Sequence, residues 1–238
     1  MNLHFSPDQV VLLQIGFFKI NSTLFSTWIV ILVLTIFASM VTGRIPVDGV
    51  SSRWQSFLEV IVEHTRQQLK ELGVTEPNFC LPFVATIFVF IAMSTLLGVI
   101  PGFTPPTASL STTAALAICV FFAVPYFGIA TSGPRHYLRR YVEPTWLMAP
   151  FNIMGDLSRT VALSVRLFGN AMSETMIIAI CLTIAPLIFP LFMKVLGLLT
   201  GMVQAYIFAV LAALYIAAGM RSRDRDSQSQ DQNREEDR

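Results

Sequence analysis

Long runs of apolar residues, each near the length of a membrane-crossing helix, are separated by short polar segments along this chain. The first run covers residues 24–43, and the next two cover residues 79–100 and 110–130. A proline-rich stretch, residues 101–106, lies between the second and third runs, where a turn would fall. About 20 apolar residues in a helix cross the hydrocarbon core of a bilayer. The pattern therefore predicts one transmembrane helix followed by a helical hairpin.

The second half of the chain contains two apolar stretches that are longer than a single span. A helix from residue 144 to residue 186 would have about 40 residues and, at 1.5 Å each, a length of about 60 Å, twice the hydrocarbon thickness. Such a helix must either break or lie steeply tilted. Residues 190–220 form the second stretch and would return beside it. These two segments are therefore predicted to form a long, tilted hairpin.

Residues 51–72 show a different pattern, with apolar and charged positions on opposite faces of a helix. The apolar positions are Trp54, Phe57, Leu58, Ile61, Val62, Leu69 and Leu72. The charged positions are Arg53, Glu59, Glu63, Arg66, Lys70 and Glu71. The pattern indicates an amphipathic helix on the membrane surface, with an ordinary connecting helix as the alternative. Residues 1–20 contain an apolar stretch too short to cross, and we expect them at the membrane interface.

The composition indicates an integral membrane protein and argues against a water-soluble enzyme. Apolar residues make up 54% of the chain and charged residues only 13%, against about 25% in soluble domains. The mean hydropathy is +0.63. A net charge of +1 provides no field for binding nucleic acid. We expect no disulfide, metal site or cofactor, because the cysteines and histidines are scattered without ligand spacing: Cys80, Cys119, Cys181, His4, His64 and His136.

The positions of lysine and arginine predict the orientation in the membrane. If five spans alternate and the N-terminus lies outside, nearly all basic residues between the spans fall on the inner face, and only Lys19 and Lys194 lie near the outer face. The predicted fold class is therefore an all-α integral membrane protein with five transmembrane helices and one amphipathic surface helix. Residues 1–220 would form its single membrane domain, and residues 221–238 a disordered, polar cytoplasmic tail.

Four charged residues lie inside the predicted tilted helix, at depths where hydrocarbon is expected: Asp156, Arg159, Arg166 and Glu174. A charge at mid-membrane costs about 2.5–3.5 kcal/mol on insertion scales, so each of them needs a partner, water or a function. At 100° per residue they form one polar stripe together with Asn170 and Ser173. Small residues on or beside the same face would let another helix approach closely: Gly155, Ala162 and Gly169.

Two interpretations of this stripe are open from the residues alone. In one, Arg166 is neutralised by an internal carboxylate and only holds a helical bundle together. In the other, its guanidinium, which stays protonated, is a fixed positive charge on an ion path whose carboxylates and amides line water-filled access on either side. Polar residues on the returning helix could add to that lining: Thr200, Gln204 and Tyr206.

Several segments resemble subunit a of the F-type ATP synthases. Residues 164–170, Ser164-Val165-Arg166-Leu167-Phe168-Gly169-Asn170, resemble its signature, and residues 204–211 resemble its last helix. Residues 97–103 and 106–113 are also similar, so the resemblance covers most of the chain between residues 81 and 215. It implies a non-catalytic stator of a rotary motor. In that motor, Arg166 separates two half-channels that carry H⁺ or Na⁺ to and from a ring of c subunits faced by the last two helices.

The resemblance also implies roles for individual residues. The implied ion-translocation residues are Arg166, Asn170, Glu174, Gln204 and Asp156, with weaker polar lining from Arg159, Ser173 and Thr175. Glu174 would line the outer access path and Asp156 the inner one. The chain departs from the family in two places. The ionisable residue that commonly lies nine positions after the arginine is Thr175 here, with Glu174 at eight, and a histidine of some proton-coupled relatives is Gly197.

The partners implied by the resemblance are the c ring, a b-type peripheral stalk subunit, the F1 sector reached through that stalk, and membrane lipid. The implied location is the bacterial inner membrane. Ser158-Arg159-Thr160 and the polar tail resemble an alternate bacterial branch, called N-type, that is thought to move sodium. One alternative is a self-contained secondary transporter whose intramembrane arginine binds an anionic substrate. Another is a structural scaffold, which would tolerate a neutral residue in place of Arg166.

Overall fold

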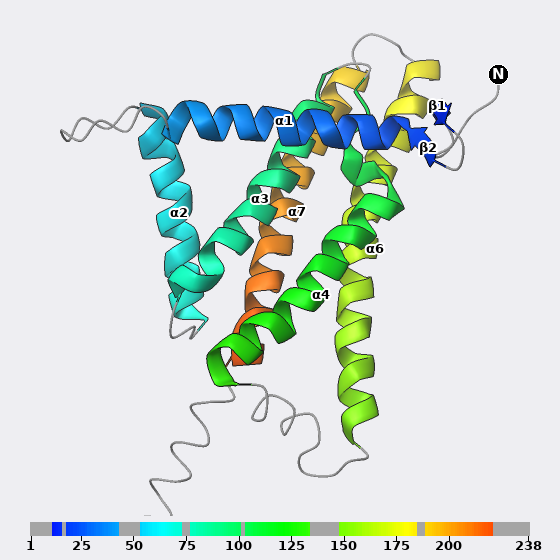
Figure 1. Ribbon diagram of the computed structural model, residues 1–238. Coiled ribbons are helices and arrows are strands. Elements are labelled where there is room, and N and C mark those ends of the chain that lie inside the picture. The colour runs from blue at the N-terminus through cyan, green and yellow to red at the C-terminus, as the bar shows by residue number, and fades with distance from the viewer. Residues whose placement is uncertain are drawn as a thin grey trace, which may run out of the picture.

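Four long apolar helices form the body of the protein (Figure 1). The computed structural model describes residues 11–15, 18–42, 53–72, 77–100, 103–133, 148–184 and 189–220. The four helices are α3 (Pro77–Gly98), α4 (Leu110–Ser132), α6 (Met148–Ile184) and α7 (Phe189–Met220), and each contains a stretch long and apolar enough to cross a membrane. The predicted turn between α3 and α4 contains a short 3₁₀ helix, η2 (Pro106–Ala108). The predicted helical membrane fold is confirmed.

The last two helices are long and unbroken. α6 has 37 residues and α7 has 32. At 1.5 Å per residue α6 is about 55 Å long, so it fits a hydrocarbon core of about 30 Å only if it tilts or projects beyond it. A break, one of the two possibilities for this segment, is therefore absent between Met148 and Ile184. α7 returns and packs against α6 as well as α3 and α4, which confirms the predicted hairpin.

The first apolar helix, α1 (Ser22–Thr42), has a different direction from the four long helices. Figure 1 shows it lying across one end of the bundle, where it packs against α3 and η2. The structure confirms the predicted helix. That α1 crosses the bilayer, which would bring the number of spans to five, stays a prediction.

A two-stranded antiparallel hairpin precedes α1, a short addition to the all-α fold that the sequence pattern did not predict. β1 (Val11–Ile15) pairs with β2 (Phe18–Asn21) so that Ile15 lies opposite Phe18. Both segments are rich in residues that favour extended pairing, whereas a helix this short is marginal. The expected location of residues 1–20 at the membrane interface stays a prediction, and residues 1–10 lie outside the described residues.

The amphipathic helix is present as α2 (Arg53–Glu71). Its apolar side packs on the bundle: Leu69 is fully buried beside Cys80 and Val84 of α3. Glu63 and Lys70, on the opposite side, are exposed. Of the other predicted apolar positions whose burial is described, Ile61 and Leu72 are partly buried, whereas Val62 is exposed, so the described residues confirm the predicted face only in part. The location of α2 on the membrane surface stays a prediction.

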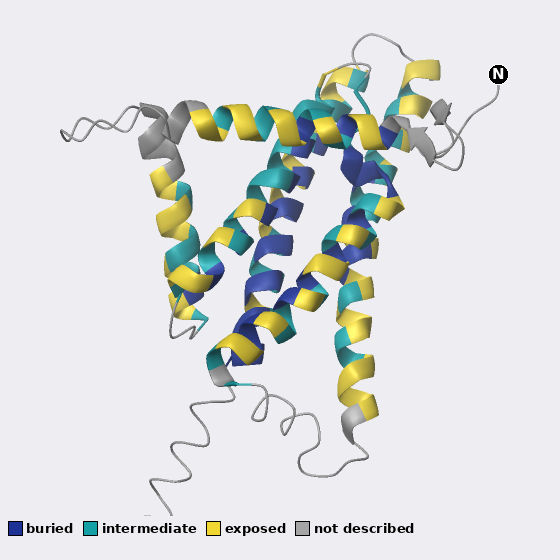
Figure 2. Ribbon diagram, in the orientation of Figure 1, coloured by how far each residue is buried: buried dark blue, intermediate teal, exposed yellow. Residues whose placement is uncertain are grey.

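The core runs along α7, which contacts α3, α4 and α6 (Figure 2). Phe208 is fully buried there with Ile91 of α3 and Leu163 of α6. α3 and α7 approach so closely that a Cβ on Gly201 would overlap the side chain of Thr95, whose Oγ1 would lie 3.0 Å away. Glycine is therefore required at 201. The predicted cytoplasmic tail, residues 221–238, lies outside the described residues.

Candidate functional site

Arg166 is the central residue of α6 and lies on an exposed face of that helix. Within the described helices, no hydrogen bond or ion pair joins its guanidinium to another residue. The described part of the chain therefore provides no internal carboxylate that neutralises it. A guanidinium does not lose its proton in a protein, so Arg166 presents a permanent positive charge on the outside of the bundle.

The face around Arg166 is open and is formed by small residues. A Cβ added to Gly155 or Gly169 would find no atom within 4 Å. Ala162 and Ser173, which lie on the same side of α6, are also exposed. We call these four residues and Arg166 the open face. Small residues allow close approach of a second helix, and no described helix of this chain covers this face.

Beside this face, but inside the bundle, α3, the turn, α6 and α7 enclose a narrow cavity of about 20 Å³, enough for about one water molecule. Three of the predicted ion-translocation residues line it together: Asn170, Glu174 and Gln204. The structure adds residues that the sequence did not indicate as part of the site. These are Thr95 and Gly98 of α3, and Pro105 and Thr107 of the turn, with Leu167, Ala171 and Gly201 completing the lining.

The carboxylate of Glu174 fits into a space that exists because residue 197 on α7 is glycine. A Cβ on Gly197 would lie 2.7 Å from Cγ of Glu174, and still closer to Cδ and Oε1. Real Cβ atoms do not approach other atoms so closely. The acidic side chain on α6 and the glycine on α7 therefore form a matched pair, which accounts in physical terms for one departure from the family pattern.

Gln204 is a buried polar residue of the cavity, with 7% of its surface exposed. Its Nε2 is fully buried and has no hydrogen-bond partner among the described residues. Buried polar atoms in proteins are almost always paired with protein or with water. The cavity beside Gln204 has room for such a water, which makes it a polar, hydratable space within an apolar bundle.

Lys194 contacts Gly98, one of the residues that line this cavity. The sequence alone placed Lys194 only at the outer end of its helix. Its Nζ donates hydrogen bonds of 3.0 Å to the carbonyl oxygens of Gly98 and Val99, at the C-terminal end of α3. No sequence motif indicated this role, because Lys194 and α3 are brought together only by helix packing.

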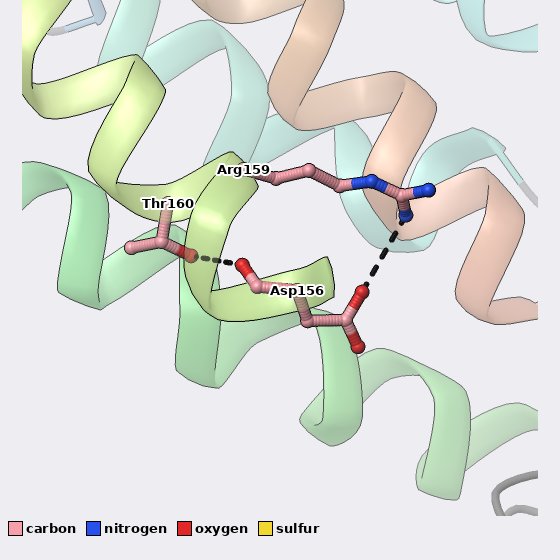
Figure 3. A network of polar contacts seen from close by, with 3 residues as sticks. All are labelled: Asp156, Arg159 and Thr160. Carbon is pink, nitrogen blue, oxygen red and sulfur yellow. Dashed lines mark hydrogen bonds and ion pairs between the residues drawn. The ribbon is translucent and has the colours of Figure 1, made fainter. Parts of the chain in front are cut away.

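On the other side of Arg166 along α6, Asp156 and Arg159 form an ion pair (Figure 3). Nη1 of Arg159 lies 3.4 Å from Oδ1 of Asp156, and the hydroxyl of Thr160 donates to the backbone carbonyl of Asp156 at 2.9 Å. The guanidinium of Arg159 also lies 5.7 Å from the ring centroid of Tyr215 on α7. A partly exposed pair of this kind contributes at most about 1 kcal/mol to stability. Along α6, the polar cavity therefore lies on one side of Arg166 and the pair of Asp156 and Arg159 on the other.

The remaining sequence candidates lie outside the cavity. Ser173 is exposed on the open face, and the hydroxyl of Thr175 donates to the carbonyl of Ala171 within α6 at 2.9 Å. Thr200 likewise bonds to its own helix. Tyr206 contacts α2 instead of α6: its hydroxyl accepts a hydrogen bond from Gln68, and its ring stacks on His64. The expectation that Tyr206 and Thr200 line the same path as Gln204 is not met.

Comparison with known proteins shows the family of this chain. The sequence model of the family described as ATP synthase A chain matches residues 24–217. The chain is 56% identical to "ATP synthase subunit a 1" of Chlorobaculum parvum over 94% of its own length and the whole of that protein. It is 53% identical to "ATP synthase subunit a" of Albidiferax ferrireducens over 93% of this chain and 96% of that one. By these matches the chain belongs to the ATP synthase A chain family, the a subunits of the F-type ATP synthases.

Proposed function

We propose that this chain leads ions to and from a rotating ring through two access paths that are separated by Arg166. A subunit a is the non-catalytic, ion-translocating stator of the Fo sector. The observation that carries the residue-level proposal is the guanidinium of Arg166, which lies on the open face at the centre of α6 and has no partner among the described residues. A polar cavity lies to one side of it along the helix, and the pair of Asp156 and Arg159 lies to the other.

Electrostatics explains what the guanidinium would do. When a carboxylate of the ring arrives opposite Arg166, attraction between the two charges favours the ionised carboxylate and so releases its proton or cation. The same positive charge repels a cation that would otherwise pass directly from one path to the other. An ion can then cross only if the ring turns between loading and release.

The access paths follow from the position of each polar group along α6. Asn170, Glu174 and Gln204 would form the outer path, because they share the hydratable cavity. Asp156 would belong to the inner path, with Arg159 holding its carboxylate. Ser173 and Thr175 are weaker candidates, since neither lines the cavity. The translocated ion is H⁺ or Na⁺.

The proposed partners and location follow from the same arrangement. The c ring would pack on the open face, where Gly155 and Gly169 leave room for a helix. A b-type stalk subunit would connect the chain to the F1 sector. The location proposed is the bacterial inner membrane, with the N-terminus outside and the C-terminus in the cytoplasm, as the distribution of Lys and Arg favours.

The test is ion flux through the whole reconstituted complex carrying Arg166→Gln or Arg166→Ala. We expect ATP hydrolysis to continue in F1 while ATP-driven ion pumping falls to background in both variants. Arg66→Gln, on α2, is the control for loss of an arginine and should pump normally. Normal pumping by Arg166→Gln would instead support the scaffold interpretation. Family membership already leaves the self-contained transporter without support.

A further inference from the structure

We propose that Lys194 determines how tightly the outer access path holds the translocated cation, by placing a fixed positive charge next to Glu174. The inference rests on the proposed function of that path. Lys194 would act through Glu174 and is therefore a positioning residue, without itself touching the ion.

Lys194 is held in place at both ends of its side chain. Its Cα belongs to α7, and its ammonium donates to two carbonyl oxygens, of Gly98 and Val99, at 3.0 Å each. The C-terminal carbonyls of a helix attract cations because they are left without intrahelical donors. A lysine side chain that is normally mobile is therefore fixed, half-buried, between α7 and the end of α3.

The fixed ammonium lies next to the proposed outer path. Gly98, which accepts one of its hydrogen bonds, also lines the cavity that contains Glu174. Gly197, against which the carboxylate of Glu174 packs, is one helical turn from Lys194 on the same face of α7. The described residues that line the cavity from α3 and the turn are uncharged, so they place no other positive charge beside Glu174.

A neighbouring positive charge weakens the hold of a carboxylate on any cation. It does so for H⁺ and for Na⁺ alike, because it favours the carboxylate with nothing bound. Two unit charges about 10 Å apart, at an effective dielectric constant of about 20, change a binding constant roughly tenfold. Lys194 would thus let Glu174 pass an ion onward instead of retaining it, and would raise the external ion concentration needed to load the path.

The experiment uses the whole complex in sealed vesicles with F1 outside, so that the vesicle interior corresponds to the outer face. ATP synthesis is driven by an imposed gradient while internal pH is varied at constant Na⁺, and internal Na⁺ at constant pH. The half-saturating concentration is taken for the ion that limits the rate in the unsubstituted complex. Lys194→Met and Lys194→Gln remove the charge, and glutamine can still donate to a carbonyl. Lys194→Arg keeps both properties.

We expect the methionine and glutamine variants to reach half-saturation at an ion concentration roughly tenfold lower, and the arginine variant to stay within about twofold of the unsubstituted complex. Lys70→Met, an exposed lysine on α2, controls for the substitution itself and should leave the value unchanged. If Lys194→Met prevents assembly of the complex, the half-saturating concentrations of Lys194→Gln and Lys194→Arg are compared instead, and the same tenfold difference is expected between them.

Two other outcomes distinguish a failure of this inference from a failure of the proposed function. If the charge-removing variants lower only the maximal rate and leave half-saturation unchanged, Lys194 merely joins α7 to α3 and the inference is wrong. If neither ion gradient drives synthesis in the unsubstituted complex, the proposed function fails and this inference fails with it.

Discussion

Replacing Gly197 by alanine tests whether Glu174 must occupy the space beside α7. The added Cβ would lie 2.7 Å from Cγ of Glu174 and overlap the carboxyl group, so the glutamate side chain would have to swing out of its place. The overlap involves the far end of a flexible side chain, and overpacking of this kind costs about 1–3 kcal/mol. Alanine recovers about 1 kcal/mol of helix propensity over glycine. We therefore expect a net loss of stability of only about 0–2 kcal/mol.

The loss of ion flux should be much larger than the loss of stability. If Glu174 belongs to the outer path, as proposed, displacing its carboxylate from the cavity would stop it from passing ions to Asn170 and Gln204. We expect ATP-driven pumping per assembled complex below about a tenth of the unsubstituted rate, a barrier increase of at least about 1.4 kcal/mol. Pumping is measured in reconstituted vesicles, and assembly and thermal unfolding of the same preparations give the stability.

Two further variants make the result specific. Gly219→Ala introduces a methyl group at the other end of α7, 3.2 Å from Cγ1 of Val124, and should lower stability slightly without affecting flux. Adding Glu174→Asp to Gly197→Ala shortens the acidic side chain by one methylene and should restore part of the flux. If Gly197→Ala pumps normally, the position of Glu174 against α7 is irrelevant to transport and the reasoning is refuted.

Two other predictions concern polar residues of α7. Gln204→Leu removes a buried amide nitrogen that lacks a partner among the described residues, so stability should be unchanged or rise by about 1 kcal/mol while pumping falls, and a thermal unfolding curve recorded beside the flux assay checks both. Equal losses of stability and flux would mean that Gln204 is a structural residue. Tyr206→Phe removes the hydroxyl that accepts a hydrogen bond from Gln68, so we expect a loss of about 0.5–1.5 kcal/mol in stability with unchanged flux. Reduced pumping in fully assembled Tyr206→Phe complexes would return Tyr206 to the ion path.

The length and period of the apolar runs predicted the large elements well. Four long helices, the turn after α3 and the amphipathic pattern of α2 all follow from interactions that are local along a helix. The β1–β2 hairpin was not predicted. Its two short segments show no clear alternation of apolar and polar residues, and they become ordered by pairing with each other. The crosswise direction of α1 depends on contacts with α3 and η2, which lie far along the chain.

The residues of the candidate site can also be divided into those that the sequence predicted and those that depend on packing between helices. Arg166, Asn170, Glu174 and Gln204 were indicated by charge within apolar sequence and by a family motif. Thr95, Thr107 and Lys194 were not, because which turn of α3 meets which turn of α7 depends on the packing of Gly201 against Thr95. Tyr206 shows the converse error: a helix wheel gives the direction of a side chain, but not the neighbour that it meets.

The open face of α6 has a mechanical consequence. Two helices with interlocked side chains resist sliding past each other, because each step requires the side chains of one helix to leave the spaces between those of the other. The side chains of Gly155, Ala162, Gly169 and Ser173 project little from the helix, and the long side chains on the same stripe are those of Arg159 and Arg166. If the c ring packs on this face, as proposed, a passing helix would find few side chains to interlock with and would be held mainly by the charges of Arg159 and Arg166.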